Sequence, residues 1–278
     1  MENKLVSIHG GHSGEFCSHA KNSLEEIIKT YIDKGFTWVG ITEHIPPLSE
    51  KFLWPDEIKQ GLNLKSAYER FERYIYTCRA LQKKYASKIK IYVGFESETH
   101  TGSDDFVKKL INIFKPDYIV GSVHHVDDMI FDYSEEHYER AVKSFVGGID
   151  ELYCRYFDLQ FSMINTLKPK VVGHFDLIRI YDTNYKERIK IPEINDKITR
   201  NLELIKKLGL ILDFNMRALS KGSTEPYISM PILKKAIDMR ITLIPGDDSH
   251  GIDSAGLNIY RGIEILTKFG INTKEFEF

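Results

Sequence analysis

The sequence predicts an α/β fold in which parallel strands close into a (β/α) barrel with fewer than eight strands. About seven short runs rich in β-branched and aromatic residues alternate with helical patterns along the 278 residues. The connections between successive runs are long enough for parallel crossovers. Residues Phe36–Thr42 show no polar alternation, as is typical of a strand with two buried faces. A doubly wound open sheet is the alternative arrangement.

The first third of the chain contains a clear helix start. Leu5–Ile8 are predicted to form the first strand. Ser23 followed by Glu26 is the pattern of a capping box, and the helix that it begins is predicted to end at Gly35. The next elements, in order, are the strand Phe36–Thr42, a long helix near Leu64–Tyr85 and the strand Ile89–Phe95.

The rest of the chain repeats this alternation. No low-complexity linker and no repeat of fixed period divides it, so residues 1–278 are predicted to form one domain. The predicted elements are the helix Asp105–Phe114, the strand Tyr118–Val123, two helices within residues 135–168, the strand Val171–Gly173, the helix Asn195–Lys207, the strand Leu210–Phe214, the helix Met230–Asp238, the strand Ile241–Pro245 and the helix Leu257–Phe269.

Composition and charge narrow the class of protein. Hydrophobic residues make up 42% of the chain, enough for a sizeable core, and the formal net charge is −2. That charge argues against a broad nucleic-acid-binding surface, although a local basic pocket remains compatible with it. Cys17, Cys78 and Cys154 cannot all pair within the chain and suit a reducing compartment. With no signal segment and no apolar run of about 18 residues, we expect a cytoplasmic protein that does not bind membranes. The oligomeric state stays open, and an oligomer is compatible with the sequence.

Most of the ten histidines lie at or just after the end of a predicted strand, and carboxylates accompany them. In a parallel barrel these strand ends meet on one face, so groups distant in sequence converge there. Imidazoles and carboxylates are ligands for zinc, manganese and iron, so the pattern predicts a metal site. Taken singly, such a histidine is more often a capping or core residue, and His100 and His137 are expected to be ordinary ones. The motifs are IHGGHS (8–13), EFCSHA (15–20), TEH (42–44), GFE (94–96), SVHH (122–125), GHFDL (173–177) and GDDSH (246–250).

These ordered motifs resemble those of the PHP family, named for polymerase and histidinol phosphatase domains, over nearly the whole chain. The resemblance implies a distorted (β/α)7 barrel that binds two to three divalent metal ions, which are zinc, manganese or iron. It also implies a ligand set for this chain. His9, His12 and Asp248 would hold a first metal, Glu96 would bridge it to a second metal held by His124 and His174, and His19, His44 and His250 would hold a third. His125 and Glu98 are not assigned as ligands.

The first motif departs from the family pattern. The family usually has two histidines separated by one residue, which lie on the same face of a strand. Here the spacing is HGGH, and residues three apart on a regular strand point to opposite faces. Gly10 and Gly11 could let the backbone turn so that His9 and His12 converge. A variant or partly occupied first metal site is therefore one expectation.

The resemblance implies hydrolysis of a phosphate monoester. Two cations about 3.5–4 Å apart can generate a nucleophile and clamp the phosphoryl oxygens. Glu96 is expected to bridge them, with a bridging hydroxide as the nucleophile. The leaving group needs a proton, and Asp248, Glu43 or a metal-bound water is a candidate donor.

Four residues are candidates for binding the substrate. Guanidinium groups match phosphate oxygens, so Arg179 and Arg217 are candidates for the phosphate, although both could be ordinary surface cations. Asn215 could hold substrate or water, or cap its strand. Glu43 could bind the amine of a cationic substrate, or it could hydrogen-bond a metal ligand.

The leading expectation is hydrolysis of L-histidinol phosphate to L-histidinol and phosphate in histidine biosynthesis. Two alternatives are a PHP phosphoesterase acting on another small phosphoester, such as a sugar phosphate or a nucleotide, and a non-catalytic metal-binding module. A metal-dependent amidohydrolase fits the GFE and SVHH motifs less well. No nucleic acid partner is expected, because the chain has neither a polymerase-sized extension nor a long basic stripe.

Overall fold

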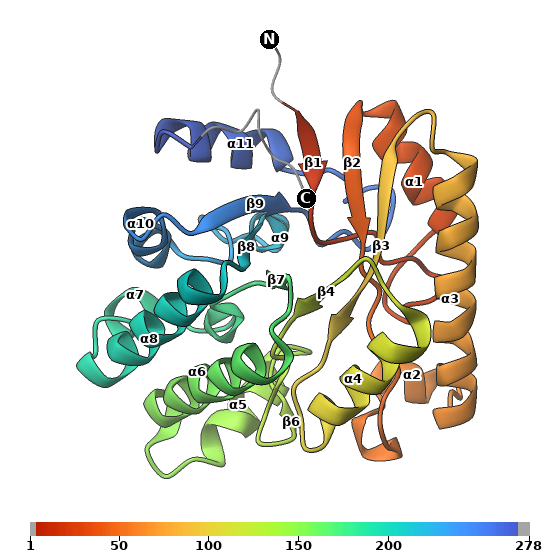
Figure 1. Ribbon diagram of the computed structural model, residues 1–278. Coiled ribbons are helices and arrows are strands. Elements are labelled where there is room, and N and C mark those ends of the chain that lie inside the picture. Colours follow the sequence, from red (N-terminus) through yellow and green to blue (C-terminus); the bar gives the residue numbers. More distant parts are fainter. Residues whose placement is uncertain (1–3, 272–278) are drawn as a thin grey trace.

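The computed structural model describes residues 4–271 and forms a nearly closed barrel of seven parallel strands (Figure 1). The Ile8 N–H donates to the Pro245 carbonyl at 2.9 Å, which ties the first strand to the last. The distorted (β/α)7 barrel is therefore confirmed, while residues 1–3 and 272–278 of the predicted domain lie outside the described residues. In barrel order the strands are β1 (Leu5–Ser7), β2 (Phe36–Ile41), β3 (Lys90–Ser97), β4 (Tyr118–Gly121), β7 (Val171–Val172), β8 (Ile211–Asn215) and β9 (Thr242–Gly246).

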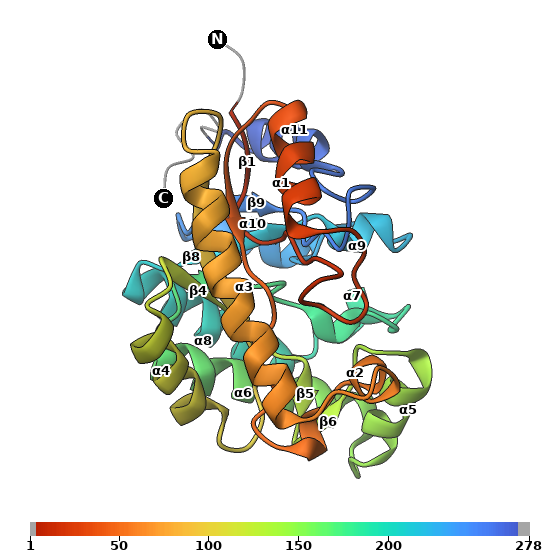
Figure 2. The same ribbon diagram turned by 90° about the vertical axis from the view of Figure 1, so that its right-hand side faces the viewer.

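Helices cover the outer side of the strands (Figure 1), and the long α3 runs along one flank of the molecule (Figure 2). The longer ones are α1 (Leu24–Asp33), α3 (Leu64–Lys84), α4 (Ser103–Phe114), α5 (Glu135–Lys143), α6 (Gly148–Leu167), α8 (Pro192–Leu208), α10 (Met230–Asp238) and α11 (Ile259–Lys268). None of the helices within residues 4–271 combines the length and the apolar character of a membrane span.

Local sequence explains these elements. The Ser23 hydroxyl accepts a hydrogen bond from the Glu26 N–H, and the Glu26 carboxylate accepts one from the Ser23 N–H, so the predicted capping box starts α1. Gly209 ends α8 in the left-handed conformation, with φ 65°. Five of the six residues of β2 are buried, which accounts for the missing polar alternation in Phe36–Thr42.

Short elements follow several strands at their carboxyl ends, and the sequence did not predict them. They are two 3₁₀ turns (Glu50–Phe52 and Leu177–Arg179), the helices α2 (Pro55–Lys59), α7 (Tyr185–Arg188) and α9 (Arg217–Ser220), and the hairpin β5 (His125–Val126) and β6 (Met129–Ile130). Such pieces lack a hydrophobic period long enough to recognise. They form the walls around the functional site described next.

Candidate metal centre and active site

Imidazoles and carboxylates from six strand ends meet at one end of the barrel. They follow β1, β2, β4, β7 and β9, and a carboxylate on β3 lies among them. The interlocking short contacts described below join eight of the nine predicted ligands, which are His9, His12, His44, Glu96, His124, His174, Asp248 and His250. His19 lies at the edge of this cluster.

Glu96, near the end of β3, lies at the centre of the cluster and is 1% exposed. Its Oε1 is 2.8 Å from His174 Nε2 and 3.4 Å from His124 Nε2. Its Oε2 is 3.2 Å from His9 Nε2 and 3.3 Å from His44 Nδ1. The two oxygens of one carboxylate therefore face two different sets of imidazoles, as a metal-bridging ligand must.

The HGGH segment turns so that both of its histidines point into the same cluster. His9 and His12 are fully buried, and together with Asp248 they place their ligand atoms within 4.8 Å of one another. Gly11 adopts φ 77°, and a Cβ on Gly10 would lie 2.3 Å from the Asp247 carboxylate. The two glycines thus permit a turn that a regular strand cannot make.

Hydrogen bonds hold this turn against the segment after β9. The Asp248 N–H donates to the His9 carbonyl at 2.8 Å, and the His12 N–H donates to the Ser249 carbonyl at 2.9 Å. Asp248 itself has a positive φ of 47°, which few residues adopt without surrounding support. Residues at opposite ends of the sequence therefore position one another.

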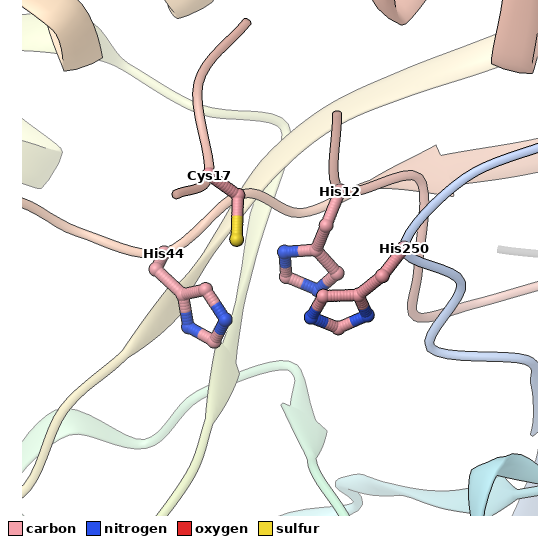
Figure 3. A group of neighbouring side chains, drawn as sticks. All are labelled: His12, Cys17, His44 and His250. Atoms are coloured by element: carbon pink, nitrogen blue, oxygen red, sulfur yellow. The ribbon is translucent and has the colours of Figure 1, made fainter. Parts of the chain in front are cut away.

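A further group of donors lies on the β2 side of the cluster. The Sγ of Cys17 and the rings of His12, His44 and His250 point toward one another (Figure 3), with ligand atoms within 4.8 Å. The His12 ring stacks on those of His44 and His250, at centroid distances of 4.5 and 4.3 Å. His19 is exposed, and its ring stacks on His250 at 4.7 Å. The sequence analysis did not consider Cys17 as a ligand.

The donor set fits divalent cations. Within residues 4–271, His9 Nε2, both ring nitrogens of His12, and His44 Nδ1 are buried without a hydrogen-bond partner. Burial by itself raises the pKa of Glu96, but the neighbouring His9 and His124 hold it well below its usual range. Burial lowers the pKa of His9, and Glu96 and Asp248 raise it well above its usual value. A multinuclear metal centre would neutralise the buried carboxylates and would bind the imidazole nitrogens that lack hydrogen-bond partners.

Comparison with known proteins agrees with this geometry. Residues 10–217 match the PHP domain. This chain belongs to the PHP family. A probable histidinol-phosphatase of Schizosaccharomyces pombe is 33% identical over 271 residues, which cover 96% of this chain and 88% of that protein.

Two solved structures share the fold of this PHP protein. A protein of Listeria monocytogenes assigned as the histidinol phosphatase HisK is 27% identical, with a TM-score of 0.80 over 92% of this chain and 99% of that one. The histidinol phosphate phosphatase of Lactococcus lactis, solved with zinc, L-histidinol and phosphate, is 19% identical. Its TM-score is 0.73, over 97% of this chain and 95% of that one.

Carboxylates behind the ligands of the PHP centre fix the orientation of the rings. Asp213 on β8 lies 2.8 Å from His9 Nδ1, and the Asn215 amide donates to the same carboxylate. Glu98 lies 2.9 Å from His124 Nδ1. These contacts select which ring nitrogen faces the cluster. Asp213 was not among the residues predicted from the sequence, although a carboxylate within the buried strand β8 was the available signal.

Glu43 lies beside a predicted metal ligand, which is one of the two positions expected from the sequence. Its carboxylate accepts hydrogen bonds from the Ser13 N–H and hydroxyl, both at 2.8 Å, and lies 3.5 Å from His12 Nδ1. Among the described residues it does not line the cavity that opens above the predicted metal ligands. Its position next to His12 agrees with a role beside a predicted metal ligand and not with a contact to substrate. Asp247, similarly, accepts from Tyr31 and Ser7 and holds the wall behind the turn.

A cavity of about 390 Å³ opens above the metal ligands. Arg217 and Lys221, at and just after α9, line it together with Trp54, Tyr133 and other side chains. Asp132 also lines it, and within residues 4–271 its Oδ1 is buried without a hydrogen-bond partner. The cavity thus combines cations and a free carboxylate around the PHP centre.

Arg179 does not belong to this cavity among the described residues. Its guanidinium is buried between the rings of Tyr185 and Tyr227 and donates to the carbonyls of Glu225 and Pro226. It therefore supports the loop that carries Tyr227, a residue of the cavity wall. Of the two arginines predicted for phosphate, the structure brings only Arg217 to the cavity.

Proposed function

We propose that this PHP protein hydrolyses L-histidinol phosphate to L-histidinol and phosphate, a step of histidine biosynthesis. The observation that carries the proposal is the placement of Glu96, whose two carboxylate oxygens face separate groups of imidazoles beneath the cavity. The relatives named as histidinol phosphatases, including one solved with zinc, L-histidinol and phosphate, support this substrate. We further propose that residues 1–278 form one domain. We also propose that the reaction takes place in the cytoplasm.

The residues of the centre have distinct tasks. When bound, divalent cations such as zinc, manganese or iron lower the pKa of water and neutralise charge on the phosphoryl group. Glu96 would hold two cations, one together with His9, His12 and Asp248 and the other together with His124 and His174. Burial raises the pKa of Asp248, but His9 and Arg217 outweigh it and lower that pKa. Asp248 therefore stays an anionic ligand, which leaves it poorly suited to donate the proton to the leaving group.

Side chains of the cavity wall bind the two ends of the substrate. The Arg217 guanidinium and the Lys221 ammonium match the phosphate. Asp132 matches the amine or the imidazolium, because its unpartnered Oδ1 lies in a wall of the same cavity. Asp56, also in the wall, is already engaged by Lys59 and Tyr133, at 3.0 and 2.9 Å. Asp132 is therefore the carboxylate that is free to recognise a cation.

A panel of phosphate monoesters tests the proposal. Release of phosphate from L-histidinol phosphate should exceed release from sugar phosphates and nucleotides, and a chelator should abolish it. Faster turnover of a sugar phosphate or a nucleotide would assign the site to another phosphoester. Metal binding without any chelator-sensitive turnover would favour the non-catalytic module.

Asp132→Asn sharpens the assignment of substrate. We expect kcat/KM for L-histidinol phosphate to fall about 10- to 100-fold, the loss typical of a charge-assisted hydrogen bond. An aryl phosphate without a cationic group should be hydrolysed at the original rate, because it offers no cation to Asp132. Asp253→Asn, at an exposed position, is the matched control. Equal losses for both substrates would show that Asp132 does not recognise the cationic end.

A further inference from the structure

The third group of donors contains a thiol where the family resemblance places an imidazole. That resemblance assigns His19, His44 and His250 to the third metal ion, whereas the side chains that gather in the structure are Cys17, His44 and His250, with His12 beside them. His12 also belongs to the group with His9 and Asp248. The donors special to the third group are therefore the thiol and the two imidazoles.

Cys17 is placed as a ligand rather than as a packing residue. It is 4% exposed, and its Sγ points at the rings of His12, His44 and His250 (Figure 3). Its N–H donates to the Ser13 carbonyl at 2.7 Å, which fixes the turn that presents the thiol. Cys78, by contrast, is buried on α3 in the hydrophobic core.

The imidazoles around the thiol are themselves short of partners. His12 is fully buried, and neither of its ring nitrogens has a hydrogen-bond partner within residues 4–271; His44 Nδ1 is also buried and unpartnered. A thiol is a weak hydrogen-bond donor and does not satisfy this set. A cation between the sulfur and one nitrogen of each ring would be held by this set of donors.

We propose that Cys17 is a thiolate ligand of the third metal ion, together with His44 and His250. The S–H bond breaks and a sulfur–metal bond forms, so one proton leaves for each ion bound. The proton is released to the solvent. The ring nitrogens of His19 lie 3.4 and 3.5 Å from Sγ, so His19 is next to the thiol. His19, exposed at the cavity mouth, is then a neighbour of the ligand sphere.

A thiolate changes which metal the third position selects. Soft sulfur favours zinc over manganese, whereas positions built from carboxylates and imidazoles accept both. The three positions of this centre are therefore unequal. We expect zinc to be retained at the third position when manganese replaces it elsewhere.

Cobalt substitution tests the ligand without turnover. This inference rests on the proposed metal-dependent function, but its readout is spectroscopic, so a protein that releases no phosphate would still report the sulfur ligand. Cobalt-loaded wild type should show a near-ultraviolet sulfur-to-cobalt charge-transfer band. Cys17→Ser should lose this band completely, and the double variant Cys78→Ser/Cys154→Ser, in which Cys17 is the remaining cysteine, should keep it.

Two further measurements decide between Cys17 and His19. His19→Ala should keep the charge-transfer band, because the sulfur ligand is intact. X-ray absorption of zinc-loaded wild type should contain a sulfur shell at about 2.3 Å, which requires no variant to fold. The absence of that shell, or a band that survives in Cys17→Ser, overturns the proposal and returns the third position to His19.

Discussion

The two sides of the metal centre are built in different ways. On the β3, β4 and β7 side, Glu96 lies within a strand, and His124 and His174 follow two residues or more after theirs. On the β1 side, His12 and Cys17 lie on an irregular segment held by hydrogen bonds to the residues after β9. Sheet register positions the first side, whereas contacts between the chain's distant ends position the second. A substitution on the first side should therefore leave the positions of the ligands nearly unchanged. A substitution on the second side should move the ligands out of place.

Glu96→Gln should have the largest effect, because it weakens the carboxylate that joins both sides. We expect kcat to fall about 1,000-fold or more, the scale of losing a central electrostatic group. Metal content should fall too, with circular dichroism unchanged. Glu69→Gln, on the exposed face of α3, is the control. If Glu96→Gln turned over substrate at the wild-type rate, Glu96 would not be a ligand that bridges two metal ions.

Gly10→Ala tests the side that depends on backbone contacts. The added Cβ would lie 2.3 Å from the Asp247 carboxylate and 3.2 Å from the Asp248 nitrogen, so the turn must shift. A displacement of this size should reduce kcat/KM about 100-fold. Gly35→Ala also adds a Cβ at a constrained glycine, but into open space. Its activity should stay near that of wild type, and equal losses in both variants would show that the turn is not the cause.

Asp213→Asn tests orientation of a ligand by a strand. The amide keeps the shape of the side chain but not the charge that faces His9 Nδ1 at 2.8 Å. Loss of such a partner typically lowers metal affinity about 10- to 100-fold. Metal titration followed by calorimetry measures it, with the exposed Asp238→Asn on α10 as control. Unchanged affinity would mean that Asp213 supports the core and not the ligand.

Arg217→Ala should have the smallest effect on activity, and it should weaken substrate binding and leave metal binding unchanged. We expect kcat/KM to fall about 10-fold through loss of a charge-assisted phosphate contact, with metal content unchanged. Arg179→Ala should instead lower the free energy of unfolding by about 2 kcal/mol or more, because it leaves buried carbonyls unpaired. Denaturant titration separates the two. Reversed outcomes would exchange the roles of the two arginines.

The sequence predicted the barrel because its strands and helices carry clear periods. It also predicted that the histidines and carboxylates converge, because most of them follow strands, while the assignment of each ligand to a metal stays a prediction from the family resemblance. It did not reveal how HGGH closes on itself, since that turn depends on Asp247, Asp248 and Ser249, more than 230 residues away. Contacts of a carboxylate with a neighbouring ring cannot be recognised in a sequence either, so both roles of Glu43, in the cavity or beside a metal ligand, stayed open. Cys17 was overlooked because one cysteine two residues from a histidine carries no recognisable spacing.

The tie between Ile8 and Pro245 has a consequence for biosynthesis of the protein. His9 leaves the ribosome long before Asp248, which lies more than 230 residues later in the chain. A nascent chain can assemble the Glu96, His124 and His174 portion, but the position shared by His9 and Asp248 exists only after β9 has docked. Cation uptake there thus requires that β9 has been synthesised and has docked, and the binding energy then stabilises only the closed barrel.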